Sequence, residues 1–219
     1  MQKITKFKNC KSPKVSETYD VNYIIDTIKN GNDKLPLIKA ARAYDKSSDN
    51  YKLIKTELLP TFRFNFNFEN SASNSNIIGS TNLMYIDVDD VEQIPDNGII
   101  YAKWKSLSKT GYGILVKTYN VNLDNFNTTY NDIGKWLNVD LDKNAGKATQ
   151  QTILSYDPDL YFNPNSITYS ATTVSNSYET KKVSNHIIKE RRECIGRNDT
   201  FLYDSESIRF NNISDYFSQ

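Results

Sequence analysis

The chain has little of what several common functional classes require. Its 219 residues include one histidine and two cysteines, Cys10 and Cys194, which lie far apart in the sequence. A serine or cysteine nucleophile paired with histidine and a His-rich zinc site therefore have poor support, and a disulfide scaffold is not expected. The net charge is only +1, which gives no overall attraction to DNA or membranes, although local basic patches could still follow a phosphate backbone.

Long apolar runs are also missing. No stretch is long enough to span a bilayer, and no apolar run follows the basic residues at the start, so we expect no signal peptide and no membrane partner. The two distant cysteines fit a reducing cytoplasm. The composition that remains, with 38% hydrophobic, 12% aromatic and 24% charged residues, is typical of a soluble globular protein with a sizeable core.

An apolar run at residues 83–88 ends in acidic residues and predicts a strand. Alternation along that strand would place Asp87 and Asp89 on one face and send Ile86 and Val88 into the core. Carboxylates at this spacing, with Cα atoms about 6–7 Å apart, can converge on divalent cations, and hard oxygen ligands favour Mg²⁺ or Mn²⁺. The alternative is an acidic strand end at which Asp90 begins a turn. The strand alone does not decide between the two.

Upstream of this strand the pattern is mostly helical. A short strand or a loose arm is expected before Asp20, and helices are expected at residues 21–28, 37–44 and 51–59. Gly31 would end the first helix and Pro60 would close the third. The period then changes, because every second residue from Phe62 to Phe68 is Phe, which predicts one half-buried strand.

Downstream, strands and one helix alternate. A loop is expected at 70–76, and strands are expected at 99–104, 114–119, 151–155 and 167–169. Asp124 is the expected N-cap of a helix whose apolar stripe is Phe126, Tyr130, Ile133, Trp136 and Leu137. The polar and charged segment 175–219 is expected to be a linker or a peripheral C-terminal tail.

Three further segments could carry chemistry. Residues 106–113 (Ser-Leu-Ser-Lys-Thr-Gly-Tyr-Gly) could present hydroxyls, backbone N–H groups and a lysine to a phosphate, or could be an ordinary hairpin loop. A second acidic cluster at 138–142 could bring Asp140 or Asp142 to the first one, or could be another acidic loop. Residues 146–149 (Gly-Lys-Ala-Thr) are similar to the end of a phosphate-binding P-loop, but Leu141 stands where that motif needs its first glycine, so we reject this assignment.

Several segments, taken in order, resemble one family. They are Leu58-Leu59-Pro60 before the Phe-rich strand, residues 85–89, residues 106–114 and residues 153–164 (Ile-Leu-Ser-Tyr-Asp-Pro-Asp-Leu-Tyr-Phe-Asn-Pro). Together they are similar to the VirE amino-terminal-like domain of primase-polymerase-like proteins of Bacteroidetes, their mobile elements and phages, which is related to the archaeo-eukaryotic primase superfamily. The likeness runs from about Tyr51 to Asn165.

The resemblance implies an α+β fold with a mixed, mostly antiparallel sheet, flanking helices and an RRM-like catalytic core. It implies one domain at 1–174, with a helical part at about 20–60 and the catalytic core at about 61–174. It implies that Mg²⁺ or Mn²⁺ is held by three carboxylates, those of Asp87, Asp89 and Asp142. It also implies that the nucleotide site is formed by Ser106, Ser108, Lys109, Gly111, Gln150 and Ser155.

The function expected from the resemblance is that of a metal-dependent nucleotidyltransferase, a DNA primase or primase-polymerase. Its partners would be nucleoside triphosphates, a single-stranded DNA template and a separate replicative helicase, in a bacterial or phage-infected cytoplasm. The alternative is a catalytically weak or inactive primase-like module that binds single-stranded nucleic acid or a replication partner, with Tyr112 or Trp104 stacking on bases. A glycosyltransferase also uses Asp-X-Asp after a strand, but the Ser-Tyr-Asp-Pro segment argues against it.

Two positions depart from the family pattern. Gly113 stands where the family commonly has histidine or lysine, and Gln150 stands where related domains usually have arginine. Both departures remove groups that could bind phosphate. Lys109, Lys117 or Lys147 could supply the missing charge.

Overall fold

The computed structural model describes residues 2–141 and 145–172, and the structural findings below concern these residues. Asp142 and the segment 175–219 lie outside them. The fold is α+β, with mostly antiparallel sheets and a few helices, as expected. None of the described helices is long and apolar enough to cross a membrane.

The central sheet has β8 (Tyr112–Tyr119) between β6 (Leu83–Val88) and β7 (Ile100–Lys105). The short strand β10 (Tyr161–Phe162) pairs with the outer side of β7, and β11 (Tyr169–Ser170) runs parallel to the end of β8. The strands near 83–88, 99–104 and 114–119 were therefore predicted well, whereas β10 was not predicted.

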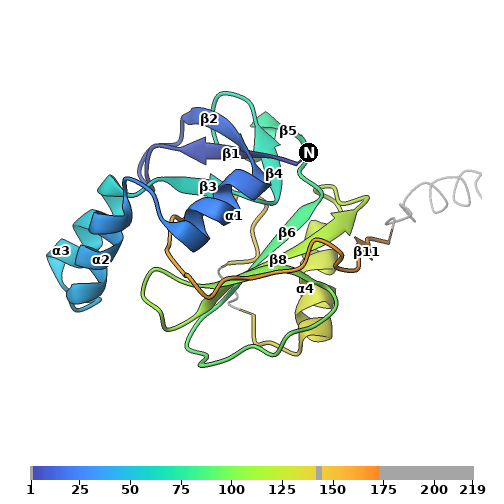
Figure 1. Ribbon diagram of the computed structural model, residues 1–219. Helices are drawn as coiled ribbons and strands as arrows, with labels where there is room; N and C mark the ends of the chain where they lie inside the picture. Colours follow the sequence, from blue (N-terminus) through green and yellow to red (C-terminus); the bar gives the residue numbers. More distant parts are fainter. Residues whose placement is uncertain (1, 142–144, 173–219) are drawn as a thin grey trace, which may run out of the picture. The chain divides into compact units, whose positions relative to one another are not determined.

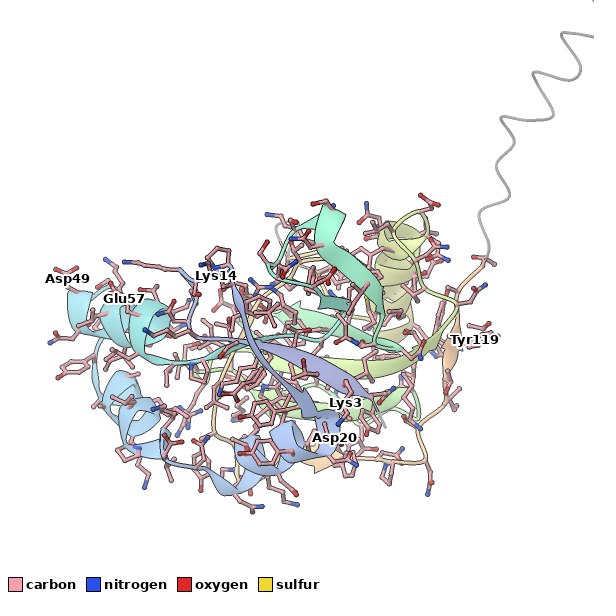
Figure 2. All side chains as sticks on the ribbon, turned by 90° about the horizontal axis from the view of Figure 1, so that it is seen from above. Lys3, Lys14, Asp20, Asp49, Glu57 and Tyr119 are labelled. Carbon is pink, nitrogen blue, oxygen red and sulfur yellow. The ribbon has the colours of Figure 1, made fainter. Side chains whose placement is uncertain are left out.

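A second sheet brings together distant parts of the chain. Its order is β2 (Val15–Asp20), β1 (Lys3–Phe7), β3 (Thr61–Arg63) and β9 (Thr152–Ile153), and the three pairings are antiparallel. The segment before Asp20 thus forms two paired strands rather than one strand or a loose arm. Lys3 and Asp20 face each other across this pair and lie close together in Figure 2.

The Phe-rich run is not one half-buried strand. It is split between β3 and β4 (Phe66–Phe68), and β4 pairs with β5 (Ile77–Ser80) in a separate two-stranded ribbon, after the short helix η2 (Asn74–Asn76). Arg63 and Asn65, which the alternation placed on an exposed face, are 4% and 2% exposed. The prediction failed because both sides of this run are covered, so polar residues there are buried as deeply as the Phe rings.

The helices of the first 60 residues lie where expected. Helix α1 (Val21–Asn30) is capped by the Asp20 side chain and ends at Gly31, whose φ of 79° suits glycine. Helix α2 (Leu35–Ala43) precedes α3 (Asp49–Leu53), which continues into the π-helical turn η1 (Ile54–Leu58) just before Pro60. Figure 1 shows α2 and α3 side by side, away from α4.

Helix α4 (Phe126–Leu137) has the predicted apolar stripe but not the predicted cap. The helix begins after Asn125 rather than Asp124, and the Asn122 side chain accepts hydrogen bonds from the backbone N–H groups of both residues at 2.9 and 3.1 Å. Trp136, expected in the stripe, is 47% exposed and packs against Tyr169.

The two faces of the central sheet have separate cores. Alternation along β6 sends Met84, Ile86 and Val88 to the face that α4 and the β4–β5 ribbon cover. Tyr85 faces the other way, with Leu115 and Trp104, into a core closed by α1, α2 and the second sheet. A side chain on the Tyr85 face at the end of β6 therefore lies between the central sheet and the helical part of the chain.

Candidate active site

Asp87 stands near the end of β6 on the face predicted for it, beside Tyr85, and Asp89 lies just beyond the strand. Asp87 is half-buried and lies opposite Gly113 of β8, which in turn lies opposite Trp104 of β7. Asp89 follows the strand and is exposed, whereas Ile86 and Val88 are buried in the core as expected. The strand end thus presents one sheltered and one open carboxylate.

A buried tyrosine orients the inner carboxylate. The Tyr85 hydroxyl donates a hydrogen bond to Asp87 Oδ1 at 3.3 Å, and the tyrosine is 5% exposed. Burial raises the pKa of Tyr85 well above its usual value, and the nearby Asp87 charge raises it further. The phenol therefore remains protonated and keeps its donor role across the physiological pH range.

The turn between β7 and β8 lies directly against this strand end. It closes with a hydrogen bond from Ser106 N to Gly111 O at 2.8 Å, and Lys109 in its middle has a φ of 64°. A Cβ atom at Gly111 would lie 2.2 Å from the Val88 carbonyl oxygen and 3.0 Å from Asp89 Cα. Only glycine lets the turn approach so closely, and a hydrogen bond from Val91 N to Thr110 O at 3.0 Å fixes the contact.

Three hydroxyl groups form a chain along the turn. Ser106 Oγ lies 3.1 Å from Ser108 Oγ, which lies 3.0 Å from Thr110 Oγ1. Tyr51 of α3 lies near this chain. Burial raises the pKa of its phenol; Ser108 and the charge of Arg42 oppose that rise, and the negative charge of Asp89 adds a smaller increase.

Arg42 of α2 joins this turn to the 155–156 part of the last segment named for the resemblance. Its Nε donates to Leu107 O at 3.0 Å, and its Nη2 donates to Ser106 O, Ser155 Oγ and Tyr156 O at 3.3, 3.2 and 2.7 Å. Burial lowers the pKa of Arg42, while the Asp157 charge opposes that change. Arg42 was not predicted, because a single arginine between alanines of a helix has no distinctive pattern.

The 155–159 segment holds the start of the turn through hydrogen bonds to the backbone of Lys105. Ser155 is 1% exposed and donates to Lys105 O at 2.8 Å while accepting from Arg42, so its hydroxyl is fully engaged inside the protein. Asp157 accepts hydrogen bonds from Lys105 N at 2.7 Å and from Asp159 N at 3.1 Å. Ser155 thus positions Arg42 and the turn rather than facing the surface.

Gly113 has a structural reason to be glycine. A Cβ atom there would lie 2.9 Å from the Trp104 ring and 2.9 Å from the Tyr85 ring. Trp104 itself is 1% exposed, so it is not available to stack on bases. Lys117 was suggested as a source of the missing phosphate-binding charge. Its ammonium group instead donates a hydrogen bond to Pro164 O at 2.7 Å and lies over the Tyr101 ring.

The other predicted site residues are placed as follows. Lys109 is exposed at the tip of the turn, and Gln150 is half-buried, with its backbone N–H donating to Lys147 O at 2.9 Å. Asp140 lines a cavity of about 360 Å³ that Asp89 and Asp90 also line. Within residues 2–141 and 145–172 no group of three or more carboxylate, thiolate or imidazole side chains could hold a metal ion, and Asp142 lies outside this range.

Comparisons with family models, with curated proteins and with solved structures found no match to this chain.

Proposed function

We propose that the chain is a metal-dependent nucleotidyltransferase of the primase-polymerase type, acting in DNA replication of a phage or mobile element. One observation carries the proposal: the hydroxyl-bearing turn and the Asp87–Asp89 strand end meet at one edge of the central sheet. Gly111 lies against Val88 and Asp89, and a hydrogen bond from Val91 N to Thr110 O joins the turn to the segment after the strand. Groups suited to phosphate and groups suited to a divalent cation are thereby brought together.

The carboxylates fit a hard metal ion. Asp89 is exposed and forms no ion pair with any described lysine or arginine, so its charge remains available to a cation. Asp87 and Asp89 would hold Mg²⁺ or Mn²⁺, and the resemblance adds Asp142. Such ions would activate the attacking hydroxyl and offset the charge that develops on the leaving group.

In the proposed reaction a 3′-hydroxyl forms a bond to the α-phosphorus of a nucleoside triphosphate, its proton is released to solvent, and pyrophosphate leaves. Ser106, Ser108 and Lys109 would contact the phosphates, and Arg42 would hold the turn in place for them. A single-stranded DNA template would direct the choice of nucleotide. Unwinding would come from a separate helicase, in the cytoplasm of the bacterial host.

Primer synthesis and extension on single-stranded DNA, with Mg²⁺ or Mn²⁺, test this proposal. We expect Asp87→Asn and Asp89→Asn each to reduce incorporation at least about 100-fold, since each change removes a ligand charge. Asp90→Asn is the matched control, because Asp90 is an exposed neighbour with a φ of 52° that asparagine also accepts. Incorporation that survives both changes would refute the mechanism.

The second candidate is a module that binds single-stranded nucleic acid without catalysis. The packing around Gly113 favours it, because Trp104 and Tyr85 leave no space there for a phosphate-binding side chain. Titration with a labelled single-stranded oligonucleotide, with and without metal and nucleotide, separates the two. Metal-independent binding together with no incorporation would support the module and exclude the enzyme.

A further inference from the structure

The proposed site needs positive charge from the protein. A nucleoside triphosphate brings several negative charges to a place that already holds Asp87 and Asp89, and phosphoryl-transfer sites use lysine or arginine as well as metal ions to balance them. Position 113 cannot supply that charge, because a side chain there would collide with Trp104 and Tyr85. Lys109 is the one cation within the turn itself, so further positive charge has to come from another segment.

Arg42 is close enough but is turned inward. Its hydrogen bonds go to three carbonyl oxygens and to Ser155 Oγ, so the guanidinium holds two backbone segments together. It is best described as a positioning residue for the turn.

Lys46, in the connection between α2 and α3, is placed differently. Its ammonium group donates to Thr110 Oγ1 at 2.5 Å, at the end of the hydroxyl chain. The neighbouring carboxylate of Asp45 is occupied by the backbone N–H and the hydroxyl of Ser47. Lys46 forms no ion pair with any described acidic residue, so its charge is held beside the turn by a neutral hydroxyl.

The hydrogen bond from Lys46 also sets the direction of the hydroxyl chain. Because Thr110 Oγ1 accepts from Lys46, its own proton is free to be donated onward, to Ser108 or to an anion. The Lys46 ammonium group and the Thr110 hydroxyl lie side by side, and both can donate hydrogen bonds to the oxygens of a phosphate group.

We propose that Lys46, with Thr110 and Ser108, binds the phosphate groups of the nucleoside triphosphate. This inference rests on the proposed function and adds that the helical part of the chain, not only the sheet, supplies the phosphate-binding charge. Lys46 then takes the role that Gly113 leaves unfilled.

Calorimetric titration of the full chain with ATP or dATP, whichever binds the wild type more tightly, tests the inference. Ca²⁺ replaces Mg²⁺ so that binding is measured without turnover, and the matching diphosphate and nucleoside are titrated in parallel. Lys46→Ala should weaken triphosphate binding at least about tenfold, the loss expected for a charge-assisted contact. It should weaken the diphosphate less and leave the nucleoside unchanged, whereas Lys46→Arg should retain most of the triphosphate affinity.

Lys39→Ala is the control, because Lys39 is an exposed lysine of α2 with no ion pair to a described residue. Triphosphate binding by Lys46→Ala at the wild-type level, an equal loss in Lys39→Ala, or an equal loss for the nucleoside would each overturn the role of Lys46. Failure of the proposed function looks different: the wild type itself would not distinguish the triphosphate from the nucleoside.

Discussion

Replacing Arg63 with Met should stabilise the protein. Arg63 of β3 is 4% exposed, its Nε and Nη1 have no hydrogen-bond partner among the described residues, and it forms no ion pair with them. Its guanidinium carbon lies 4.7 Å from the centroid of the Phe7 ring. A buried charge without an acidic partner usually costs more than an apolar side chain of similar size.

The pKa of Arg63 gives the size of that cost. Burial lowers it from 12.5 to about 10, partly opposed by Cys10. At about 1.4 kcal/mol for each pKa unit, keeping the guanidinium charged at pH 7 costs about 3 kcal/mol. The contact with the Phe7 ring returns about 0.5–2 kcal/mol. Arg63→Met should therefore raise the free energy of unfolding by about 1–2 kcal/mol and Tm by about 2–8 °C.

The dependence on pH provides a second readout. Between pH 10 and 12.5 the unfolded chain keeps the Arg63 proton that the folded protein has lost, so the contribution of Arg63 to stability becomes less unfavourable as the pH rises in this range. Below about pH 10 the full cost is present. The advantage of Arg63→Met should thus be constant from pH 7 to 9 and shrink above pH 10, and comparing the two proteins at each pH cancels the titration of shared groups.

Arg42→Met is the matched control, since it should change stability in the opposite direction. It removes four hydrogen bonds to Leu107, Ser106, Ser155 and Tyr156, and we expect a loss of about 2–4 kcal/mol. Urea and thermal unfolding at pH 7 measure both variants. If Arg63→Met lowers Tm as Arg42→Met does, the reasoning about the unpartnered buried charge is refuted.

Three further changes have defined outcomes. Gly113→Ala should cost about 1–3 kcal/mol in urea unfolding because its Cβ would press on the Trp104 and Tyr85 rings, whereas Gly79→Ala, with no atom within 4 Å of its Cβ, should stay within about 0.5 kcal/mol. Asn65→Ala should cost about 2–3 kcal/mol, since Asn65 Oδ1 accepts from Tyr85 N at 2.8 Å and its Nδ2 donates to Lys147 O; a loss under 1 kcal/mol would show that water replaces these bonds. Tyr85→Phe should keep Tm within a few degrees and yet reduce primer extension several-fold, because Asp87 loses an orienting donor; unchanged extension would show that Tyr85 only fills the core.

Local patterns predicted much of the sheet and its site. The apolar run before Asp87 predicted β6 and the direction of Asp87, because a strand needs only the alternation of its own residues. The apolar stripe beginning at Phe126 predicted α4, because the 3.6-residue period of a helix is also a property of its own residues. The spacing of Ser106 and Gly111 predicted the turn, although not its contact with the strand end.

What the sequence did not predict depends on contacts between distant segments. Arg42, Lys46 and Tyr51 meet the turn only because α2 and α3 fold back onto it, and nothing in their own neighbourhood marks them. The Phe-rich run was misjudged at Arg63, since burial of both its sides is a property of the surrounding layers. Gly113 was read as a lost functional group, and the structure adds a packing reason for its small size.

The position of β3 sets an order of events as the chain is made. β3 pairs on one side with β1, at Thr5 and Arg63, and on the other with β9, at Thr61 and Ile153, so the second sheet cannot be completed until residue 153 has been synthesised. The β7–β8 hairpin can form much earlier, because its partners are neighbours in sequence. Arg42 can form its hydrogen bonds to Ser155 and Tyr156 only after these two residues have been synthesised. An unfinished chain would therefore carry Asp87 and Asp89 without the hydrogen bonds that tie the 106–111 turn to the 155–156 segment, and the proposed site would be complete only after residue 156 has been added.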